Sequence, residues 1–120
     1  MAIKLLLNPA AEAKECIHPE TGVKFTIRPI NPAKQSEIRK ASLGKNGEFD
    51  AAKWGANFAV EAIAGWDDQI GDATGPLECS DENKRTFGRN QAINIMPWIV
   101  DQATSLDQYR VEEETAAKND

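Results

Sequence analysis

The stretch from Val23 to Arg28 alternates strictly between apolar and polar residues, and it constrains the fold more than any other feature of the sequence. Its apolar residues, Val23, Phe25 and Ile27, fall on one face of an extended strand, and its polar residues fall on the other. Such a strand is buried on one face only. The chain must therefore supply other elements that cover this apolar face.

A second strand is expected just before this one. Glu15–Ile17 leads into His18–Gly22, which is a good turn sequence, so a β-hairpin is predicted over residues 13–30. Ile3–Leu7 is a candidate third strand. Because two strands alone are marginal in water, helices must pack against the apolar face of the hairpin.

The rest of the chain carries helix signals. Asn31 can act as an N-cap with Pro32 at the first helical position, and Asp50 and Ser80 can cap two later helices. The expected helices span residues 32–43, 51–64, 81–87 and 90–114.

These elements predict an α+β fold, mainly α, in which the N-terminal β-hairpin is followed by about four helices in one small domain. Gly88 weakens the third helix, and Pro97 should kink or restart the helix after it. The single domain is expected to span residues 1–111. Residues 112–120 are polar and are expected to form a frayed C-terminal tail.

Gly65 and Trp66 follow the second predicted helix. A glycine just past a helix end commonly adopts the left-handed conformation that terminates the helix. Trp66 then falls where such a terminator places its hydrophobic contact, one turn back against Val60. The sequence therefore predicts that Gly65 and Trp66 form a structural helix stop, with the tryptophan anchoring the following connector to the core.

The composition suits one compact domain without a membrane segment. The chain has 120 residues, of which 41% are hydrophobic and 28% are charged, and its net charge is -5. Its longest apolar run is far shorter than the roughly 20 residues of a membrane span, and its first residues lack the features of a signal peptide. The acidic balance is the opposite of the basic patch that nucleic-acid binding needs. We therefore expect a cytoplasmic protein that binds neither a membrane nor a nucleic acid.

The loop from Asp67 to Glu78 has the length of a calcium-binding EF-hand loop. An EF-hand loop needs oxygen ligands at its third and fifth positions and a glycine at its sixth. Those positions hold Gln69, Gly71 and Asp72, so the sequence predicts a turn-rich acidic connector. Two cysteines and one histidine, scattered along the chain, do not supply the ligands of a zinc site. No metal ion or other cofactor is predicted.

Few residues suit catalysis. His18 is the single histidine and lies two residues from Cys16, so the two side chains share a strand face without a third group to orient them. The phosphate-binding patterns GxxxxGK[ST] and GxGxxG do not occur. Asp67, Asp68 and Asp72 could pair as acid and base, but loops carry such residues routinely. A non-enzymatic protein is therefore predicted, with both cysteines as free thiols.

Four apolar residues of the last predicted helix form the candidate partner-binding surface. They are Trp98, Ile99, Leu106 and Tyr109, and they belong to an apolar stripe longer than a small core needs. Trp98 follows Pro97, where the helix should break, and it suits the core and an interface equally well.

Four segments occur in a distinctive order. The strand Val23–Arg28 is followed by Ile30–Arg39, which opens a helix. Ala62–Asp68, with the sequence Ala-Ile-Ala-Gly-Trp-Asp-Asp, then ends the second predicted helix, and Asp72–Lys84 leads into the third. In this order of signals the chain resembles the small tail assembly chaperones of long-tailed bacteriophages and their prophages.

The resemblance covers roughly residues 21–110 and is most specific over Gly65–Lys84. In that family a Gly-Trp pair with a nearby acidic residue commonly closes a helix, and a Ser-x-Glu-Asn cap leads into the C-terminal helices. The resemblance implies a chaperone without a cofactor that binds the tape-measure protein. It would keep the long hydrophobic helices of that protein in solution while subunits of the tail-tube protein are recruited.

The negative net charge agrees with this function, since it helps to keep such a complex dispersed. Two alternatives stay open. One is another phage morphogenesis or structural protein, such as a head–tail connector or a tail-tube component. The other, less favoured, is a small enzyme that uses Cys16 or the aspartate loop.

Overall fold

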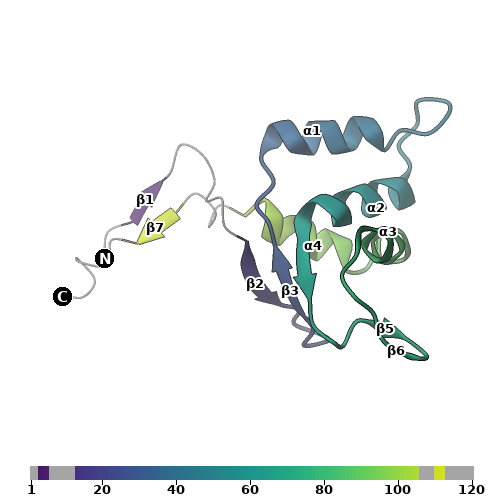
Figure 1. Ribbon diagram of the computed structural model, residues 1–120. Helices are drawn as coiled ribbons and strands as arrows, with labels where there is room; N and C mark the ends of the chain where they lie inside the picture. The colour runs from purple at the N-terminus through teal and green to yellow at the C-terminus, as the bar shows by residue number, and fades with distance from the viewer. Residues whose placement is uncertain (1–2, 6–12, 106–109, 113–120) are drawn as a thin grey trace.

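In the computed structural model, which describes residues 3–5, 13–105 and 110–112, an antiparallel sheet of order β2–β3–β4 packs against helices (Figure 1). The strands of this sheet are β2 (Lys14–Ile17), β3 (Lys24–Ile27) and β4 (Ile63–Trp66). The helices of the described segments are α1 (Pro32–Ala41), α2 (Ala51–Ala62), α3 (Asp81–Asn90) and α4 (Met96–Ala103). The predicted fold class is confirmed, because the hairpin β2–β3 precedes four helices in one small α+β domain over the described segments.

The alternation in β3 is confirmed by its burial. Val23, Phe25 and Ile27 are buried, whereas Lys24 and Arg28 are exposed. The apolar face of the sheet is covered by side chains of the helices. The shared core comprises Val23, Phe25, Ile27, Ile30, Ile38, Phe58, Ala59, Ala62, Ile63, Met96, Ile99 and Ala103. The hairpin is thus stabilised by helices, as its apolar face requires.

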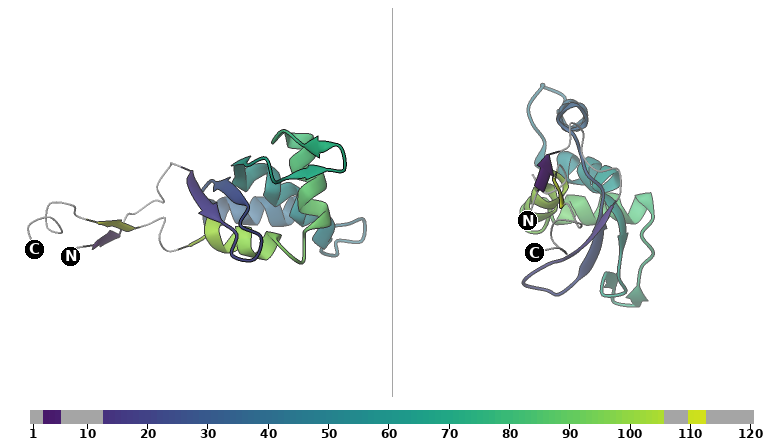
Figure 2. Two further views of the ribbon diagram at one scale, coloured as in Figure 1. Left: turned by 90° about the horizontal axis from the view of Figure 1, so that it is seen from below. Right: turned by 90° about the vertical axis from the view of Figure 1, so that its left-hand side faces the viewer.

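The third strand of this sheet comes from a different part of the chain than expected. β4 pairs antiparallel with β3, whereas β1 (Ile3–Leu5) pairs with β7 (Arg110–Glu112) in a separate two-stranded sheet. Figures 1 and 2 show β1 and β7 side by side, apart from the main sheet and the helices. The prediction that Ile3–Leu7 extends the hairpin is therefore wrong.

The predicted N-caps are confirmed. Each side-chain oxygen accepts a hydrogen bond from the backbone N–H three residues further on, at 2.8 Å for Asn31, 3.1 Å for Asp50 and 3.2 Å for Ser80. The helix ends differ: α1 and α2 stop before residues 43 and 64, and α3 continues past residue 87. None of the helices in the described segments is long and apolar enough to cross a membrane.

The prediction of a helix stop at Gly65 and Trp66 is wrong. α2 ends at Ala62, and Ile63 already has the extended φ of -86° and ψ of 112°. Gly65 and Trp66 lie in β4, where they pair with Thr26 and Phe25 of β3. Within the described segments, positive φ values occur at other glycines, so Gly65 is not left-handed. The local signal predicts the end of a helix at Gly65. Backbone pairing with β3 instead makes this segment a strand.

The prediction of one helix over residues 90–114 is also wrong. Residues 91–95 form turns, and α4 begins at Met96 with Pro97 in its first turn. This restart is the one expected from a proline, which lacks the N–H that a helix interior uses. α4 ends at Ala103, and residues 110–112 form β7. The predicted polar tail, residues 112–120, lies outside the described residues except for Glu112, the last residue of β7.

α3 continues through Gly88 because this glycine is a packing site. α2 makes its most extensive contact with α3, and the two backbones meet at Gly55 and Gly88. A Cβ built on Gly88 would overlap the carbonyl oxygen of Gly55 and would lie 2.7 Å from the Cβ of Ala59. The glycine that lowers helix propensity here therefore permits a close helix crossing.

Candidate partner-binding surface

The structure does not bring the four predicted partner-binding residues together on a surface. Ile99 is fully buried, because Met96, Ile99 and Ala103 form the stripe of α4 that faces the core. Leu106 and Tyr109 lie outside the described residues. The prediction that Ile99 contacts a partner is therefore wrong.

Trp98 is half-buried and belongs to an aromatic cluster at the sheet. Its ring centroid lies 5.0 Å from that of His18, in an edge-on arrangement, and 5.9 Å from that of Phe25. Trp98 is also packed against the core. Of the two roles that suit this residue, the core role accounts for these contacts.

His18 and Cys16 make separate local contacts. The backbone N–H of Thr21 donates to His18 Nδ1 at 3.3 Å, and the hydroxyl of Thr21 lies 3.0 Å from the same nitrogen. The thiol of Cys16 donates to the carbonyl of Lys14 at 3.8 Å. Burial raises the pKa of the Cys16 thiol, which leaves it protonated rather than activated. His18 thus bonds within the turn after β2, whereas Cys16 bonds within β2 itself.

Asp67 and Asp72 of the loop accept hydrogen bonds that stabilise its turns. The carboxylate of Asp67 accepts hydrogen bonds from the backbone N–H groups of Lys24 and Gln69, each at 3.0 Å. Asp72 Oδ1 accepts from the hydroxyl of Thr74 at 2.6 Å and from its backbone N–H at 2.8 Å. These bonds lower the pKa of Asp72, with the hydroxyl contributing most. Among the residues that the structure describes, no three His, Cys, Asp or Glu side chains are grouped as a metal site.

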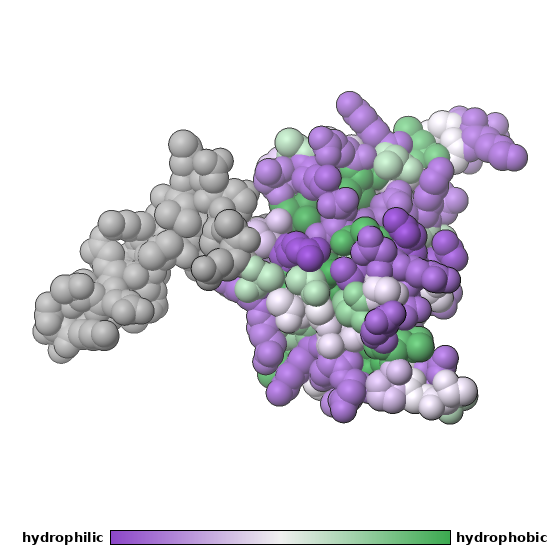
Figure 3. All heavy atoms as spheres, viewed as in Figure 1, coloured by the Kyte–Doolittle hydropathy of each residue, from purple (hydrophilic) through white to green (hydrophobic). Residues whose placement is uncertain are grey.

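The same loop forms one wall of a hollow that the sequence did not predict. β5 (Gly71–Asp72) and β6 (Gly75–Pro76) form a small hairpin, and beside it lies a hollow of about 300 Å³. Its apolar lining consists of Trp66, Ile70, Leu77 and Phe87, and we call it the Trp66 groove. Figure 3 shows a hydrophobic area beside the β5–β6 hairpin, surrounded by hydrophilic residues.

Trp66 contacts residues on both sides of this groove. Its ring centroid lies 5.6 Å from that of Phe87 on α3, and its Nε1–H donates to the carbonyl of Leu77 at 2.9 Å. The backbone N–H of Leu77 in turn donates to the carbonyl of Ile70 at 3.0 Å. These contacts connect β4, the loop after it and α3 through the side chain of Trp66. A hollow with an apolar lining and a few polar groups is the usual form of a binding site.

The opposite wall of the Trp66 groove is one face of α3. Asn83, Thr86 and Asn90 line the groove together with Phe87, at the spacing of a single helix face, and Gln91, directly after the helix, completes this wall. Asn83 uses its amide to donate to the carbonyl of Glu78 at 2.9 Å. This spacing was the signal in the sequence that could have indicated a polar wall around Phe87.

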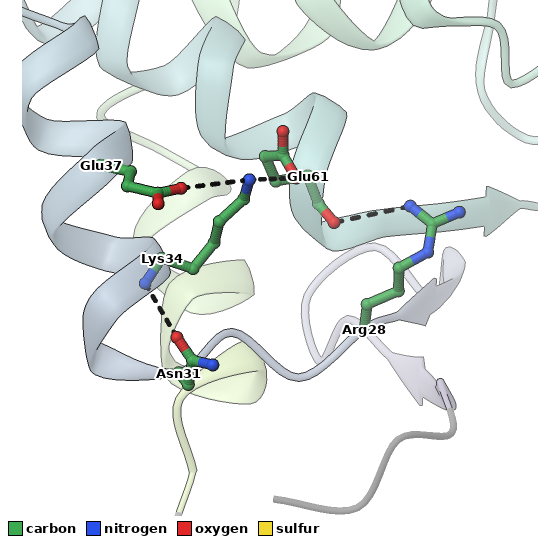
Figure 4. A network of polar contacts seen from close by, with 5 residues as sticks. All are labelled: Arg28, Asn31, Lys34, Glu37 and Glu61. Atoms are coloured by element: carbon green, nitrogen blue, oxygen red, sulfur yellow. Dashed lines mark hydrogen bonds and ion pairs between the residues drawn. The ribbon is translucent and has the colours of Figure 1, made fainter.

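A second hollow, of about 290 Å³, lies between α1 and α2. Three of its charged residues, Lys34, Glu37 and Glu61, are paired with one another, as Figure 4 shows. Lys34 Nζ lies 3.4 Å from a carboxylate oxygen of Glu37 and 3.4 Å from one of Glu61, and Arg28 donates to the carbonyl of Glu61 at 3.5 Å. The carboxylate of Glu61 is the main cause of the raised pKa of Lys34. These pairs connect two helices, so the Trp66 groove is the better candidate for binding a partner.

Comparisons with known proteins add nothing to this candidate: no family model, no curated protein and no solved structure matches the chain.

Proposed function

We propose that this chain is a non-enzymatic tail assembly chaperone of a long-tailed bacteriophage or prophage. In this role it acts in the bacterial cytoplasm, binds the tape-measure protein and helps to recruit tail-tube protein subunits. The proposal rests on the resemblance carried by the segments over residues 21–110, above all Gly65–Lys84.

One structural observation supports a binding role for that segment. Gly65–Lys84 supplies Trp66, Ile70 and Leu77 to the Trp66 groove, and α3 closes the groove with Phe87. The most specific part of the resemblance is therefore also the part of the chain that borders the candidate binding site. A chaperone needs such a surface, because a long helical client exposes apolar side chains until the tail tube covers them.

Co-expression tests the proposal. A tape-measure protein made alone should aggregate, because its apolar helix stripes have no partner. Production of this chain in the same cells should move the tape-measure protein from the pellet to the supernatant, and the two proteins should co-purify. The proposal fails if the tape-measure protein stays in the pellet when the wild-type chain is abundant and folded.

Purified virions distinguish the chaperone from a structural component. A chaperone should be absent from finished particles, whereas a head–tail connector or a tail-tube component should be retained in them. Mass spectrometry of purified particles measures this directly. Retention of the chain at a fixed number of copies per particle would favour a structural role.

A further inference from the structure

We infer that the Trp66 groove binds a basic amphipathic helix of the tape-measure protein, in which large apolar side chains are flanked by lysine or arginine. This inference rests on the proposed function and adds to it the surface of this chain and the chemistry of the client segment.

The size and lining of the groove suit part of a helix. A hollow of about 300 Å³ is at the small end of the range for binding sites, so it accommodates apolar side chains from one face of a helix. Trp66 and Phe87 form a paired aromatic surface inside it, and aromatic surfaces of this kind are common anchors at interfaces. Leu77 is 36% exposed, so part of the apolar lining faces solvent in the free chain.

Polar groups on the α3 wall add hydrogen-bonding capacity beside this apolar surface. Asn90 is exposed and Gln91 is half-buried, and both line the groove. Each side-chain amide offers a donor and an acceptor. They can therefore bind the polar margin of an amphipathic helix while its apolar side chains enter the groove.

Charge decides which kind of helix fits. The segment that builds the loop side of the groove, residues 67–83, contains no lysine or arginine, and its acidic residues are Asp67, Asp68, Asp72, Glu78, Asp81 and Glu82. One of them, Asp72, lines the groove directly, and its carboxylate is ionised at neutral pH, as an aspartate ordinarily is. An acidic loop along one side of an apolar groove favours a cationic segment over an acidic one. A second copy of this acidic chain is therefore a poorer occupant than a basic helix.

A substitution on the α3 wall tests the groove without touching the core. Thr86 is exposed and lines the groove, so Thr86→Lys places a positive charge where the basic helix would bind. Ser36→Lys is the matched control, because Ser36 is exposed on α1 and the added charge is the same. Both variants are first checked for an unchanged circular dichroism spectrum and Tm, then co-expressed with the tape-measure protein.

We expect Thr86→Lys to reduce co-purification of the tape-measure protein by about tenfold, the effect of a modest interface hot spot, and Ser36→Lys to leave it unchanged. If folded Thr86→Lys co-purifies with its client as well as the wild type does, the groove is not the binding site, although the proposed function survives. If the wild type itself fails to co-purify, the proposed function fails. If Thr86→Lys instead abolishes self-association of this chain in size-exclusion chromatography and leaves client binding intact, the occupant is a second copy, and the inference is overturned.

A second pair of variants tests the charge argument. Asp68 and Glu78 are exposed, so the double variant Asp68→Asn/Glu78→Gln removes two negative charges from the segment that builds the loop side of the groove. Glu20→Gln/Glu48→Gln removes the same charge from exposed positions elsewhere. The first pair should weaken co-purification several-fold in washes at about 50 mM salt and have less effect at about 500 mM, where exposed charges are screened. Equal behaviour of the two pairs would show that the client segment is not selected by its basic charge.

Discussion

The crossing of α2 and α3 at Gly55 and Gly88 gives the sharpest test of the fold. We consider Gly88→Ala. At an ordinary helix position this change would stabilise the protein by about 1 kcal/mol, because alanine has the higher helix propensity. Here the new methyl group would overlap the backbone of Gly55 and lie 2.7 Å from the Cβ of Ala59, closer than Cβ atoms approach other heavy atoms. Backbone cannot rotate away from such a contact, so the two helices must separate.

The size of the effect follows from two opposing contributions. Overpacking of a tight interior costs about 1–3 kcal/mol, and more where the neighbour cannot move. The gain in helix propensity offsets about 1 kcal/mol of this cost. Because the obstructing atoms are mostly backbone, we expect overpacking at the upper end of its range and a net loss of about 2 kcal/mol. For a domain of this size each kcal/mol corresponds to about 4–8 °C in Tm.

Thermal or urea unfolding measures this loss, and Gly65→Ala is the matched control. A Cβ on Gly65 would meet side-chain atoms of Thr26 at 3.6 and 3.7 Å, which is ordinary contact, and its φ is not positive. Gly65→Ala should therefore be neutral or slightly stabilising, since glycine is unfavourable within a strand. A rise in Tm for Gly88→Ala would refute the close crossing. A loss of 1 kcal/mol or more for Gly65→Ala would instead favour the left-handed helix stop.

Three further predictions concern single groups. The lowered pKa of Asp72 means that the contribution of this carboxylate to stability is present above the ordinary value of 3.8 and is lost as pH falls through the lower folded value. The amide NMR signal of Thr74 should therefore titrate below pH 3.8, and Asp72→Asn should abolish that titration. Burial raises the pKa of the Cys16 and Cys79 thiols, so both should react with iodoacetamide at pH 8 more slowly than free cysteine does; faster reaction would contradict the burial. Calcium at about 1 mM should leave Tm unchanged, whereas a site with a dissociation constant of about 10 μM would add about 2.7 kcal/mol.

Features determined by neighbouring residues were predictable from the sequence. The burial of Val23, Phe25 and Ile27 follows from their alternation, and the N-caps at Asn31 and Asp50 follow from side chains that bond within three residues. These interactions need no information from distant parts of the chain. The hairpin and the starts of α1, α2 and α3 were therefore placed well.

Features determined by distant pairing were not predictable in the same way. A glycine after a helix signals a terminator, yet Gly65 instead pairs with Thr26 across the sheet. Helical periodicity likewise shows which residues share a face but not which face is covered. Ile99 is buried because α4 packs on α2 and β3, contacts that no local pattern reveals.

The segment Gly65–Lys84 shows how one sequence pattern serves both the fold and the candidate site. A Cβ on Gly71 would overlap the carbonyl oxygen of Gly75, and Gly75 has a φ of 139°, so this turn requires glycine at both positions. The tight turn returns the chain to Trp66, whose indole binds the carbonyl of Leu77. Removal of Trp66 would therefore damage core packing and the groove at once, and loss of client binding in such a variant would not identify the surface. Thr86 is exposed on the facing wall, so the effect of its substitution on binding can be separated from an effect on folding.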